Sequence, residues 1–348
     1  MRVLIVKASA LGDVVHALPV LAWIKSADAA SEIDWLVEAG FAPLLENHPL
    51  IGKIHRIDTK SWRRQGKLAG LSAARETIRA LRAEHYDVVL DLQGNSKSGF
   101  FTLFSGARRR YGFDRAAVRE WPNLLATTDK VALGEAEHHI SERSLAVARG
   151  AFPDGEEAPA AGPLPVAEEE KRKISEMLRS RGLGARPLVV FHYGTTWSTK
   201  LWSLENWQEL ARRVGERESA DLVLTWGNDE EKRAAETIAA ASSDRAFIWP
   251  RGTLRELTAL LARADLVVGG DTGPIHIAAA VGTPTVSLFR VTDASRNGPR
   301  GETHLRLQAP LECSPCLRKE CERDVECGLS ISVDTVADSV GGLLGQSF

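Results

Sequence analysis

The sequence lacks several features that mark whole classes of protein. None of its apolar runs approaches the roughly 18 residues that a membrane-spanning helix needs. The formal net charge is only −2, which excludes a generally basic nucleic-acid binder. Near the N-terminus, Lys7 and Asp13 interrupt the apolar segment, so it does not read as a secretory signal. We therefore expect a cytoplasmic protein that binds no nucleic acid.

The composition is that of an ordinary globular protein. Hydrophobic residues make up 44% and charged residues 26% of the 348 residues, a length that fits two domains. Apolar runs of strand length alternate with helical patterns, which is typical of α/β domains with parallel sheets. Residues 153–165 are rich in Pro, Ala, Gly and Glu and have the composition of a linker.

This pattern predicts two Rossmann-like, doubly wound domains. The N-terminal domain covers residues 1–165 and the C-terminal domain residues 166–332. A helix over 333–348 follows, and the sequence leaves open whether it packs back on the N-terminal or on the C-terminal domain. Ligands of such domains bind outside the carboxyl ends of the strands, so we expect a site in the cleft between the domains.

The individual elements follow from the apolar periodicity. The strands expected in the first half cover residues 3–6, 33–37, 53–57 and 87–90, and the helices 14–24, 71–83 and 139–149. The strands expected in the second half cover residues 188–191, 222–224, 246–248, 266–268 and 285–289, and the helices 168–181, 204–214, 230–241, 254–264 and 274–280.

Positive charge is concentrated in one part of the chain. Between Lys53 and Arg119 there are 15 Lys and Arg against 6 Asp and Glu, a surplus of +9, so the rest of the chain carries −11. Such a segment fits an acidic partner, for example a phosphorylated lipid, a nucleic acid or a sugar acid. A solvated surface of arginine-bearing helices explains the same charge equally well.

The first glycine turn follows the strand at 3–6. Gly12 permits a close backbone approach, and Asp13 stands at the start of a helix. Asp13 is then either a helix N-cap or a carboxylate held at the strand end, suited to work as a general base.

The second glycine turn lies between the strand at 266–268 and a helix that opens at Pro274. The free N–H groups and the positive end of that helix favour an anion, and Thr272 and Gly273 allow a phosphate to approach closely. His276 falls in the first helical turn. A purely structural turn with a buried histidine is the alternative. Neither a Walker A loop nor G-x-G-x-x-G occurs, which disfavours a nicotinamide enzyme.

A third loop completes this set. After the strand at 188–191, Thr195, Thr196 and Lys200 place hydroxyls and an ammonium group where a diphosphate could bind. Together with the turn around Asp271, this loop predicts a diphosphate site in the C-terminal domain.

Three segments of the sequence resemble a known family. Residues 1–19 (MRVLIVKASALGDVVHALP), Asp91-Leu-Gln-Gly94 and Gly270-Asp-Thr-Gly-Pro-Ile-His276 are similar to the lipopolysaccharide heptosyltransferases of glycosyltransferase family 9, in matching order from Met1 to about Gly298. Lys7 and His16 make the first segment most similar to the heptosyltransferase I branch, which adds the first heptose. The resemblance implies the GT-B architecture, with two Rossmann-like domains that bind donor and acceptor across a cleft.

The resemblance also implies a reaction. It is an inverting transfer of heptose from ADP-L-glycero-β-D-manno-heptose to the Kdo of Kdo2-lipid A, with Asp13 as the general base. The donor-binding residues that it implies are Thr195, Thr196, Lys200, Glu230, Gly252, Asp271, Thr272, Gly273 and His276. The acceptor-binding residues expected in the N-terminal domain are Ser9, Gly12, Lys60, Arg63, Arg64, Lys97 and Arg119.

The sequence contains no Asp-x-Asp pair, the usual carrier of a metal ion for nucleotide-sugar diphosphates. We therefore expect no catalytic metal, and expect Lys200 and the helix end to meet the leaving-group charge. A lipid acceptor implies peripheral contact with the cytoplasmic face of the inner membrane. We also expect a monomer. The alternatives are a family member with another acceptor (a second or third heptose) or another nucleotide sugar, and a nucleotide-sugar epimerase of the same architecture.

All four cysteines lie close together in the sequence. Their spacing is Cys313-x2-Cys316-x4-Cys321-x5-Cys327. A structural zinc or iron–sulfur site, disulfides and free buried thiols are the three interpretations of this cluster. None of them gives the cysteines a catalytic role.

Overall fold

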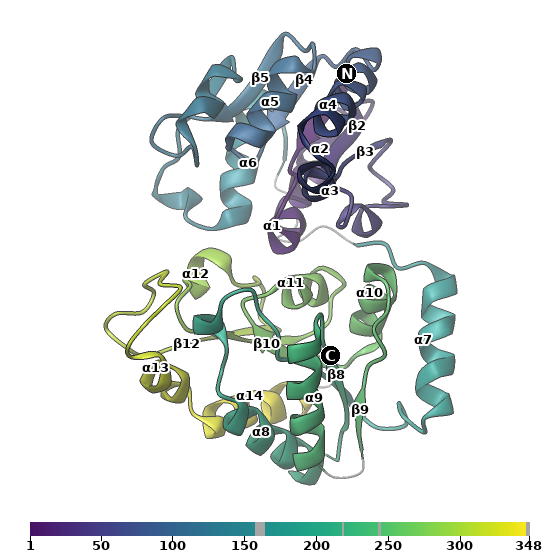
Figure 1. Cartoon of the computed structure of the whole chain (residues 1–348), viewed down its shortest axis with the longest axis vertical. Helices are drawn as coiled ribbons and strands as arrows, with labels where there is room; N and C mark the ends of the chain where they lie inside the picture. The colour runs from purple at the N-terminus through teal and green to yellow at the C-terminus, as the bar shows by residue number, and fades with distance from the viewer. Residues whose placement is uncertain (157–163, 218, 243–244, 346–348) are drawn as a thin grey trace. The chain divides into compact units, whose positions relative to one another are not determined.

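The computed structural model describes residues 1–156, 164–217, 219–242 and 245–345. Most of the predicted linker lies outside the described residues. The chain divides into two compact units, unit 1 (Met1–Pro165) and unit 2 (Val166–Phe348). Each unit contains one six-stranded parallel sheet flanked by helices, which confirms the predicted fold class of two doubly wound α/β units (Figure 1).

In unit 1 the strand order is β3-β2-β1-β4-β5-β6. The strands are β1 (Arg2–Val6), β2 (Glu32–Glu38), β3 (Ile54–Ile57), β4 (Val88–Asp91), β5 (Arg109–Phe113) and β6 (Asp129–Val131). The helices are α1 (Leu11–His16), α2 (Pro19–Ala27), η1 (Ala42–Leu44), α3 (Thr59–Gln65), α4 (Lys67–Ala83), α5 (Ser96–Phe104), η2 (Trp121–Leu125), η3 (Glu135–Glu137) and α6 (Ile140–Ala151).

In unit 2 the strand order is β12-β11-β10-β7-β8-β9. The strands are β7 (Leu188–His192), β8 (Asp221–Thr225), β9 (Ala246–Ile248), β10 (Leu266–Gly270), β11 (Thr285–Phe289) and β12 (His304–Gln308). The helices are α7 (Glu168–Ser180), η4 (Ser198–Lys200), α8 (Leu204–Arg217), α9 (Asp229–Ala241), α10 (Leu254–Arg263), α11 (Gly273–Ala280), α12 (Ala294–Asn297), α13 (Asp324–Ser330) and α14 (Val333–Leu344).

Both sheets have the same topology. In each, the chain starts at a central strand, runs outward to one edge, and then returns to the other side of that central strand. The direction therefore reverses between β1 and β4 in unit 1 and between β7 and β10 in unit 2. Loops that leave the carboxyl ends of two such strands diverge, and the crevice between them is where ligands of doubly wound sheets bind.

Some elements differ from those predicted. The single helix expected over 14–24 is two helices, because Pro19 opens α2 at its first turn and cannot donate to a continuing α1. Strands β5, β6 and β12 were not predicted. The charged run from Arg108 to Arg110 hid β5, whose apolar residues occupy only the second half of the strand.

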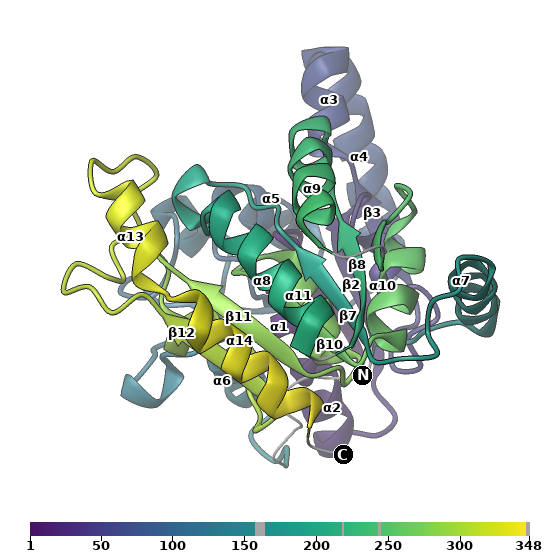
Figure 2. The same cartoon turned by 90° about the horizontal axis from the view of Figure 1, so that it is seen from below.

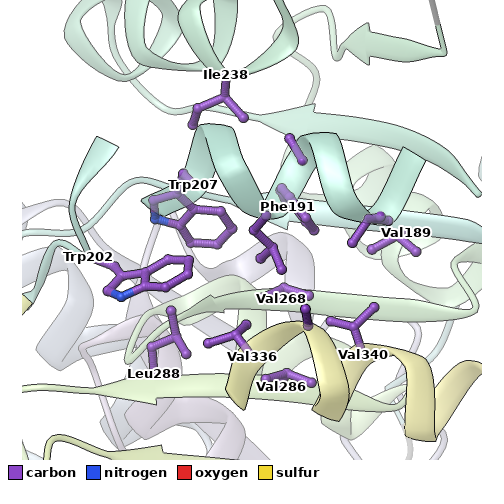
Figure 3. Packing of buried hydrophobic residues seen from close by; sticks show 14 of the residues in the cluster. Val189, Phe191, Trp202, Trp207, Ile238, Val268, Val286, Leu288, Val336 and Val340 are labelled. Atoms are coloured by element: carbon purple, nitrogen blue, oxygen red, sulfur yellow. The ribbon is translucent and has the colours of Figure 1, made fainter. Parts of the chain in front are cut away.

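The C-terminal helix packs on unit 2, which is one of the two placements that the sequence left open. Figure 2 shows α14 beside α8 and the strands β10 and β11, and the contacts between these elements agree. Val336 and Val340 of α14 are fully buried. In Figure 3 they face the strands that carry Val268 and Val286. Burial of this apolar stripe decides where the helix lies.

Aromatic side chains fill the other end of the same core. Trp202 and Trp207 are buried, with ring centroids 5.5 Å apart, and Phe191 of β7 lies 5.0 Å from Trp207 (Figure 3). The indole N–H of Trp202 donates to the carbonyl of Ile331, 3.0 Å away. This packing fixes the segment that follows Lys200.

The described helices include none whose length and apolar character would let it span a membrane.

Candidate active site

The candidate residues of unit 2 all follow carboxyl ends of strands. They come from four loops, which leave β7, β8, β9 and β10: Thr195, Thr196, Lys200, Glu230, Gly252, Asp271, Thr272, Gly273 and His276. Because the strands are parallel, these loops share one edge of the sheet. The loops after β7 and β10 flank the point at which the strand order reverses.

A buried ion pair joins those two loops. Lys200 Nζ lies 2.7 Å from Oδ2 of Asp271 and 3.3 Å from its backbone carbonyl. His276 Nε2 lies 3.3 Å from the other carboxylate oxygen, Oδ1. Burial alone would raise the pKa of Asp271, but His276 and Lys200 lower it below its ordinary value. The carboxylate is therefore ionised, and it holds two cationic or donor groups at the crevice.

The N-terminus of α11 lies directly beside this pair. Thr272 is the N-cap residue, but its side chain does not cap the helix and donates instead to the carbonyl of Gly270, 3.3 Å away. The amide groups of the first helical turn and the positive helix end thus receive no side-chain cap. An anion such as a phosphate fits such a helix end.

The loop after β7 supplies further donors. The hydroxyl of Thr195 is buried and has no hydrogen-bond partner among the described residues, whereas Thr196 is exposed. The ammonium groups of Lys200 and Lys319 each lie 5.1 Å from the ring centroid of Trp197. Lys319 was not among the predicted site residues, because it lies within the cysteine cluster and far in sequence from the loops predicted to bind the diphosphate.

His192 ends β7 beside this loop. Its ring is buried, and Nδ1 lies 2.9 Å from the hydroxyl of Thr225. Burial lowers the pKa of His192 to about 4, so the ring is neutral at pH 7. The Thr225 hydroxyl itself donates to the carbonyl of Phe191. His192 therefore supports the strand end and adds no positive charge to the crevice.

Glu231, at the start of α9, lies against the β7 loop and is the neighbour of the predicted residue Glu230. Glu230 is exposed, and its amide donates to the side chain of Asn228. Glu231 accepts from the amide of Gly227 at 2.6 Å. A Cβ at Gly194 would lie 2.2 Å from the Glu231 carboxyl carbon, so a larger residue there would displace this carboxylate. The repeated Glu in the sequence gave no signal to choose between Glu230 and Glu231.

Gly252 follows β9 and is exposed. A Cβ there would lie 2.8 Å from the carboxylate of Glu256 and 3.4 Å from the indole nitrogen of Trp249. The carbonyl of Trp249 accepts from the indole N–H of Trp226, 2.7 Å away. These two indoles give the loop a rigid apolar side.

In unit 1, Asp13 is not the N-cap of its helix. Ala10 is the N-cap residue of α1, and Asp13 is the third helical residue. Its Oδ2 accepts from the Ala10 amide at 3.0 Å, and no other hydrogen bond to this carboxylate comes from the described residues. Asp13 is half-buried and follows the carboxyl end of β1.

The Asp91-Leu-Gln-Gly94 segment braces this loop. Lys7 Nζ donates to the Leu92 carbonyl at 2.9 Å, and the side-chain oxygen of Gln93 accepts from the amides of Ala8 and Ser9, both at 3.1 Å. The two segments flank the strand reversal of unit 1, since one follows β1 and the other β4. The Gln93 side chain and the Leu92 carbonyl thereby hold the segment that leads to Asp13.

Asp91 itself has a structural role. Its Oδ1 accepts from the amides of Gln93 and Gly94, and its Oδ2 from Thr102 and Asn123. Burial raises the pKa of Asp91, against the effect of these donors. Asp91 therefore satisfies backbone donors at the end of β4.

The predicted acceptor residues surround the same edge. Lys60, Arg63 and Arg64 lie on α3 after β3, and Arg119 follows β5; all four are exposed. Lys97 is different, because its ammonium group pairs with Glu38 at 2.6 Å. Gly12 and Ser9 are half-buried beside Asp13.

Lys7 and Arg143 are two basic side chains of this region that were not among the predicted site residues. Lys7 is buried, and burial is the main cause that lowers its pKa, while the charge of Asp13 acts in the opposite direction. The charges of Arg119 and Arg143 lower the same pKa further. Arg143 comes from α6 and donates to the Ala117 carbonyl at 3.0 Å. Its sequence position, remote from every motif, gave no signal.

The four cysteines do not form the metal site that their spacing suggested. No group of three or more His, Cys, Asp or Glu side chains in the described parts of the chain could hold a metal ion. All four are free thiols; Cys313 is exposed and Cys327 is buried on α13. Burial raises the pKa of Cys327 despite a hydrogen bond from Arg290, which favours the thiol over the thiolate that binds metals.

Two doubly wound units of this topology make up the GT-B fold class, in which the solved structures of heptosyltransferases match this chain. A profile of glycosyltransferase family 9 (heptosyltransferase) matches residues 74–325. The chain belongs to glycosyltransferase family 9 and is a heptosyltransferase.

The similarity extends over almost the whole chain. Lipopolysaccharide heptosyltransferase 1 of Pseudomonas aeruginosa is 35% identical over 324 residues, which cover 92% of this chain and 87% of that protein. The solved structure of Escherichia coli heptosyltransferase WaaC with ADP has a TM-score of 0.79 at 25% identity and covers 99% of this chain and 100% of its own. The structure of WaaC with ADP-2-deoxy-2-fluoro heptose has a TM-score of 0.75 at 25% identity and covers 98% and 99%.

The buried His192 predicts a pH dependence of stability. Its folded pKa of about 4 lies below the ordinary value of 6.5, so the unfolded state binds the proton more tightly. The stabilising contribution is therefore complete above about pH 6.5 and is lost as the pH falls to about 4. Between these values, the wild type should lose about 3 kcal/mol more than His192→Asn in urea unfolding.

The control is His85→Asn, because His85 is exposed. This variant should follow the wild-type profile. Parallel profiles for the wild type and His192→Asn would contradict a neutral, buried ring at the end of β7.

Proposed function

We propose that this chain transfers a heptose from ADP-heptose to the Kdo of a lipopolysaccharide inner-core acceptor, the first heptose of that core. The observation that carries the proposal is the 35% identity, over 92% of the chain, with lipopolysaccharide heptosyltransferase 1 of Pseudomonas aeruginosa. Among solved structures, WaaC with ADP-2-deoxy-2-fluoro heptose supports the same donor.

Unit 2 suits the ADP part of such a donor. The diphosphate would bind at the N-terminal amides of α11, with Lys200 and the buried Thr195 hydroxyl as further donors. Asp271 would hold the Lys200 ammonium group in position through their ion pair. The exposed backbone of Gly252, beside Trp249, fits contact with the adenine.

Unit 1 suits the acceptor. Asp13 would take the proton from the acceptor hydroxyl while the oxygen of that hydroxyl attacks the anomeric carbon of the heptose. The bond from that carbon to the diphosphate breaks, and ADP leaves with the electron pair. The charge that develops on ADP would be met by Lys200 and the end of α11. Inversion at the anomeric carbon follows from a single displacement.

The exposed cations of unit 1 suit an acidic acceptor. Arginine forms paired hydrogen bonds with carboxylates and phosphates, and Arg63, Arg64 and Arg119 stand at the carboxyl edge that also bears Asp13. Lys60 adds a fourth charge. Lys97 contributes less, because Glu38 already neutralises it. An acceptor embedded in lipid would bring the protein to the cytoplasmic face of the membrane.

The deciding experiment measures ADP release from ADP-heptose with and without heptose-free Kdo2-lipid A, together with the mass of the lipid. Acceptor-dependent release and the mass of one added heptose support the proposal. Tight ADP binding without transfer would move the question to another acceptor in the same core. Conversion of the nucleotide sugar without any acceptor would favour an epimerase instead.

Asp13→Asn tests the general base. The amide keeps the shape and the bond from Ala10 but cannot accept a proton, so kcat should fall by about 10²- to 10⁴-fold. The Kd for ADP should stay within about twofold, because a base acts in the transition state. A large loss of ADP binding, measured by calorimetry, would instead make Asp13 part of the donor site.

Lys200→Met tests the diphosphate contact. Loss of a charged hydrogen bond should weaken ADP binding about 10- to 100-fold and leave adenosine binding almost unchanged. Lys319→Met is the matched control, since it removes a charge from the same Trp197 ring without touching Asp271. Equal losses for ADP and adenosine in Lys200→Met would count against the proposed contact.

A further inference from the structure

Unit 1 exposes several large apolar side chains. Apart from Met1, the large apolar side chains that are exposed in its described residues lie on only three elements, α4, α5 and η2: Leu68, Leu71, Phe100, Leu103, Phe104, Trp121 and Leu125. Trp121 is 69% exposed and Leu125 71%. Contiguous exposed apolar groups of this size usually mark a binding surface.

These three elements share one face of the sheet. The connections from β3 to β4, from β4 to β5 and from β5 to β6 all move in the same direction across the strand order. Right-handed crossovers in one direction place their helices on one face. Contacts between α4 and α5, and between α5 and η2, agree. We call the exposed side chains of α5 and η2, namely Phe100, Leu103, Phe104, Trp121 and Leu125, the apolar face.

The apolar face is built into the fold. Phe100, Leu103 and Phe104 are three and four residues apart, so they share one side of α5, while Phe101 and Thr102 point into the unit. The rings of Phe100 and Phe104 lie 5.1 Å apart. This helix is therefore apolar on its exposed side as well as on its buried side, whereas an ordinary surface helix has a polar exposed side.

A buried polar contact holds η2 against α5. A Cβ at Gly99 would lie 3.0 Å from the side-chain nitrogen of Asn123, so glycine allows the close approach. Asn123 donates to Asp91 at 2.6 Å and to the Asn95 carbonyl at 3.0 Å. Trp121 and Leu125, on either side of Asn123, are thus held outward.

The surroundings of the apolar face are basic. Residues 96–130 contain 7 Lys and Arg against 3 Asp and Glu. Arg108, Arg115 and Arg119 are exposed, as are Lys60 and the arginines of α3. A second copy of the chain bound by the same face would bring these like charges together, which disfavours self-association. An apolar centre with a basic rim is complementary to a bilayer surface with anionic headgroups.

We propose that the apolar face is a membrane-docking surface that inserts shallowly into an anionic lipid leaflet. Trp121 is suited to the headgroup region, where indole rings concentrate. The start of α5 lies at the carboxyl edge of the sheet, next to the candidate acceptor residues, so docking would bring that edge close to the headgroups. The inference rests on the proposed lipid acceptor for its purpose, but not for its test.

The test measures co-sedimentation of the full chain with vesicles. Vesicles of phosphatidylcholine mixed with phosphatidylglycerol should bind the wild type, and vesicles of phosphatidylcholine alone should bind it much less. Salt at about 1 M, which screens charges beyond about 3 Å, should release it. The double variant Trp121→Ser with Leu125→Ser should bind at least about tenfold more weakly.

A matched control comes from unit 2. Val325 and Leu329 lie four residues apart on α13, as Trp121 and Leu125 do on η2, and they are 74% and 56% exposed. Val325→Ser with Leu329→Ser should bind vesicles like the wild type. Equal losses in both double variants, or none in either, would overturn the proposal. So would a dimer in sedimentation velocity that the Trp121→Ser, Leu125→Ser variant dissociates.

Activity separates this inference from the proposed function. With a detergent-dispersed acceptor, the Trp121→Ser, Leu125→Ser variant should keep its kcat, whereas with vesicle-embedded acceptor its turnover should fall about tenfold. If no acceptor supports transfer by the wild type, the proposed function fails. Vesicle binding that depends on the apolar face would still support the docking surface in that case.

Discussion

Parallel strand direction is the constraint on which the rest of this structure depends. Within each sheet all strands are parallel to one another, so all loops that follow a strand gather at one edge of that sheet. The reversal of strand order between β1 and β4, and again between β7 and β10, then separates the two central loops and opens a crevice. Segments far apart in sequence, such as Asp91–Gly94 and the loop that carries Asp13, meet for this reason alone.

Two buried carboxylates support these edges in different ways. Asp271 is paired with Lys200 and His276, which lower its pKa, and so it holds positive groups where a diphosphate would bind. Asp91 is bound by neutral donors, and burial raises its pKa. It organises the backbone instead of balancing a charge. Asp271 thus orients charged groups, and Asp91 fixes the conformation of the backbone. Removal of either carboxylate would leave buried groups without partners.

Much of the fold and part of the site could be predicted from the sequence. Buried parallel strands are continuous apolar runs, so the central strands of both units were found. Strands β5, β6 and β12 lie toward the edges of their sheets and are shorter or more polar, and their apolar pattern is correspondingly weak. The glycine turns at Gly12 and at Asp271–Gly273 were visible because a tight strand-to-helix turn needs particular residues at fixed spacing.

The sequence by itself determined the two α/β units, the strand-end location of the candidate residues and the family, because these depend on local patterns and short motifs. Only the tertiary structure decided which remote side chains join those motifs. Arg143 and Glu231 reach the site edges through the packing of α6 and α9. Packing also placed α14 on unit 2 and left Trp121 and Leu125 exposed beside α5. Burial depends on what covers a side chain, and that is a property of the assembled fold.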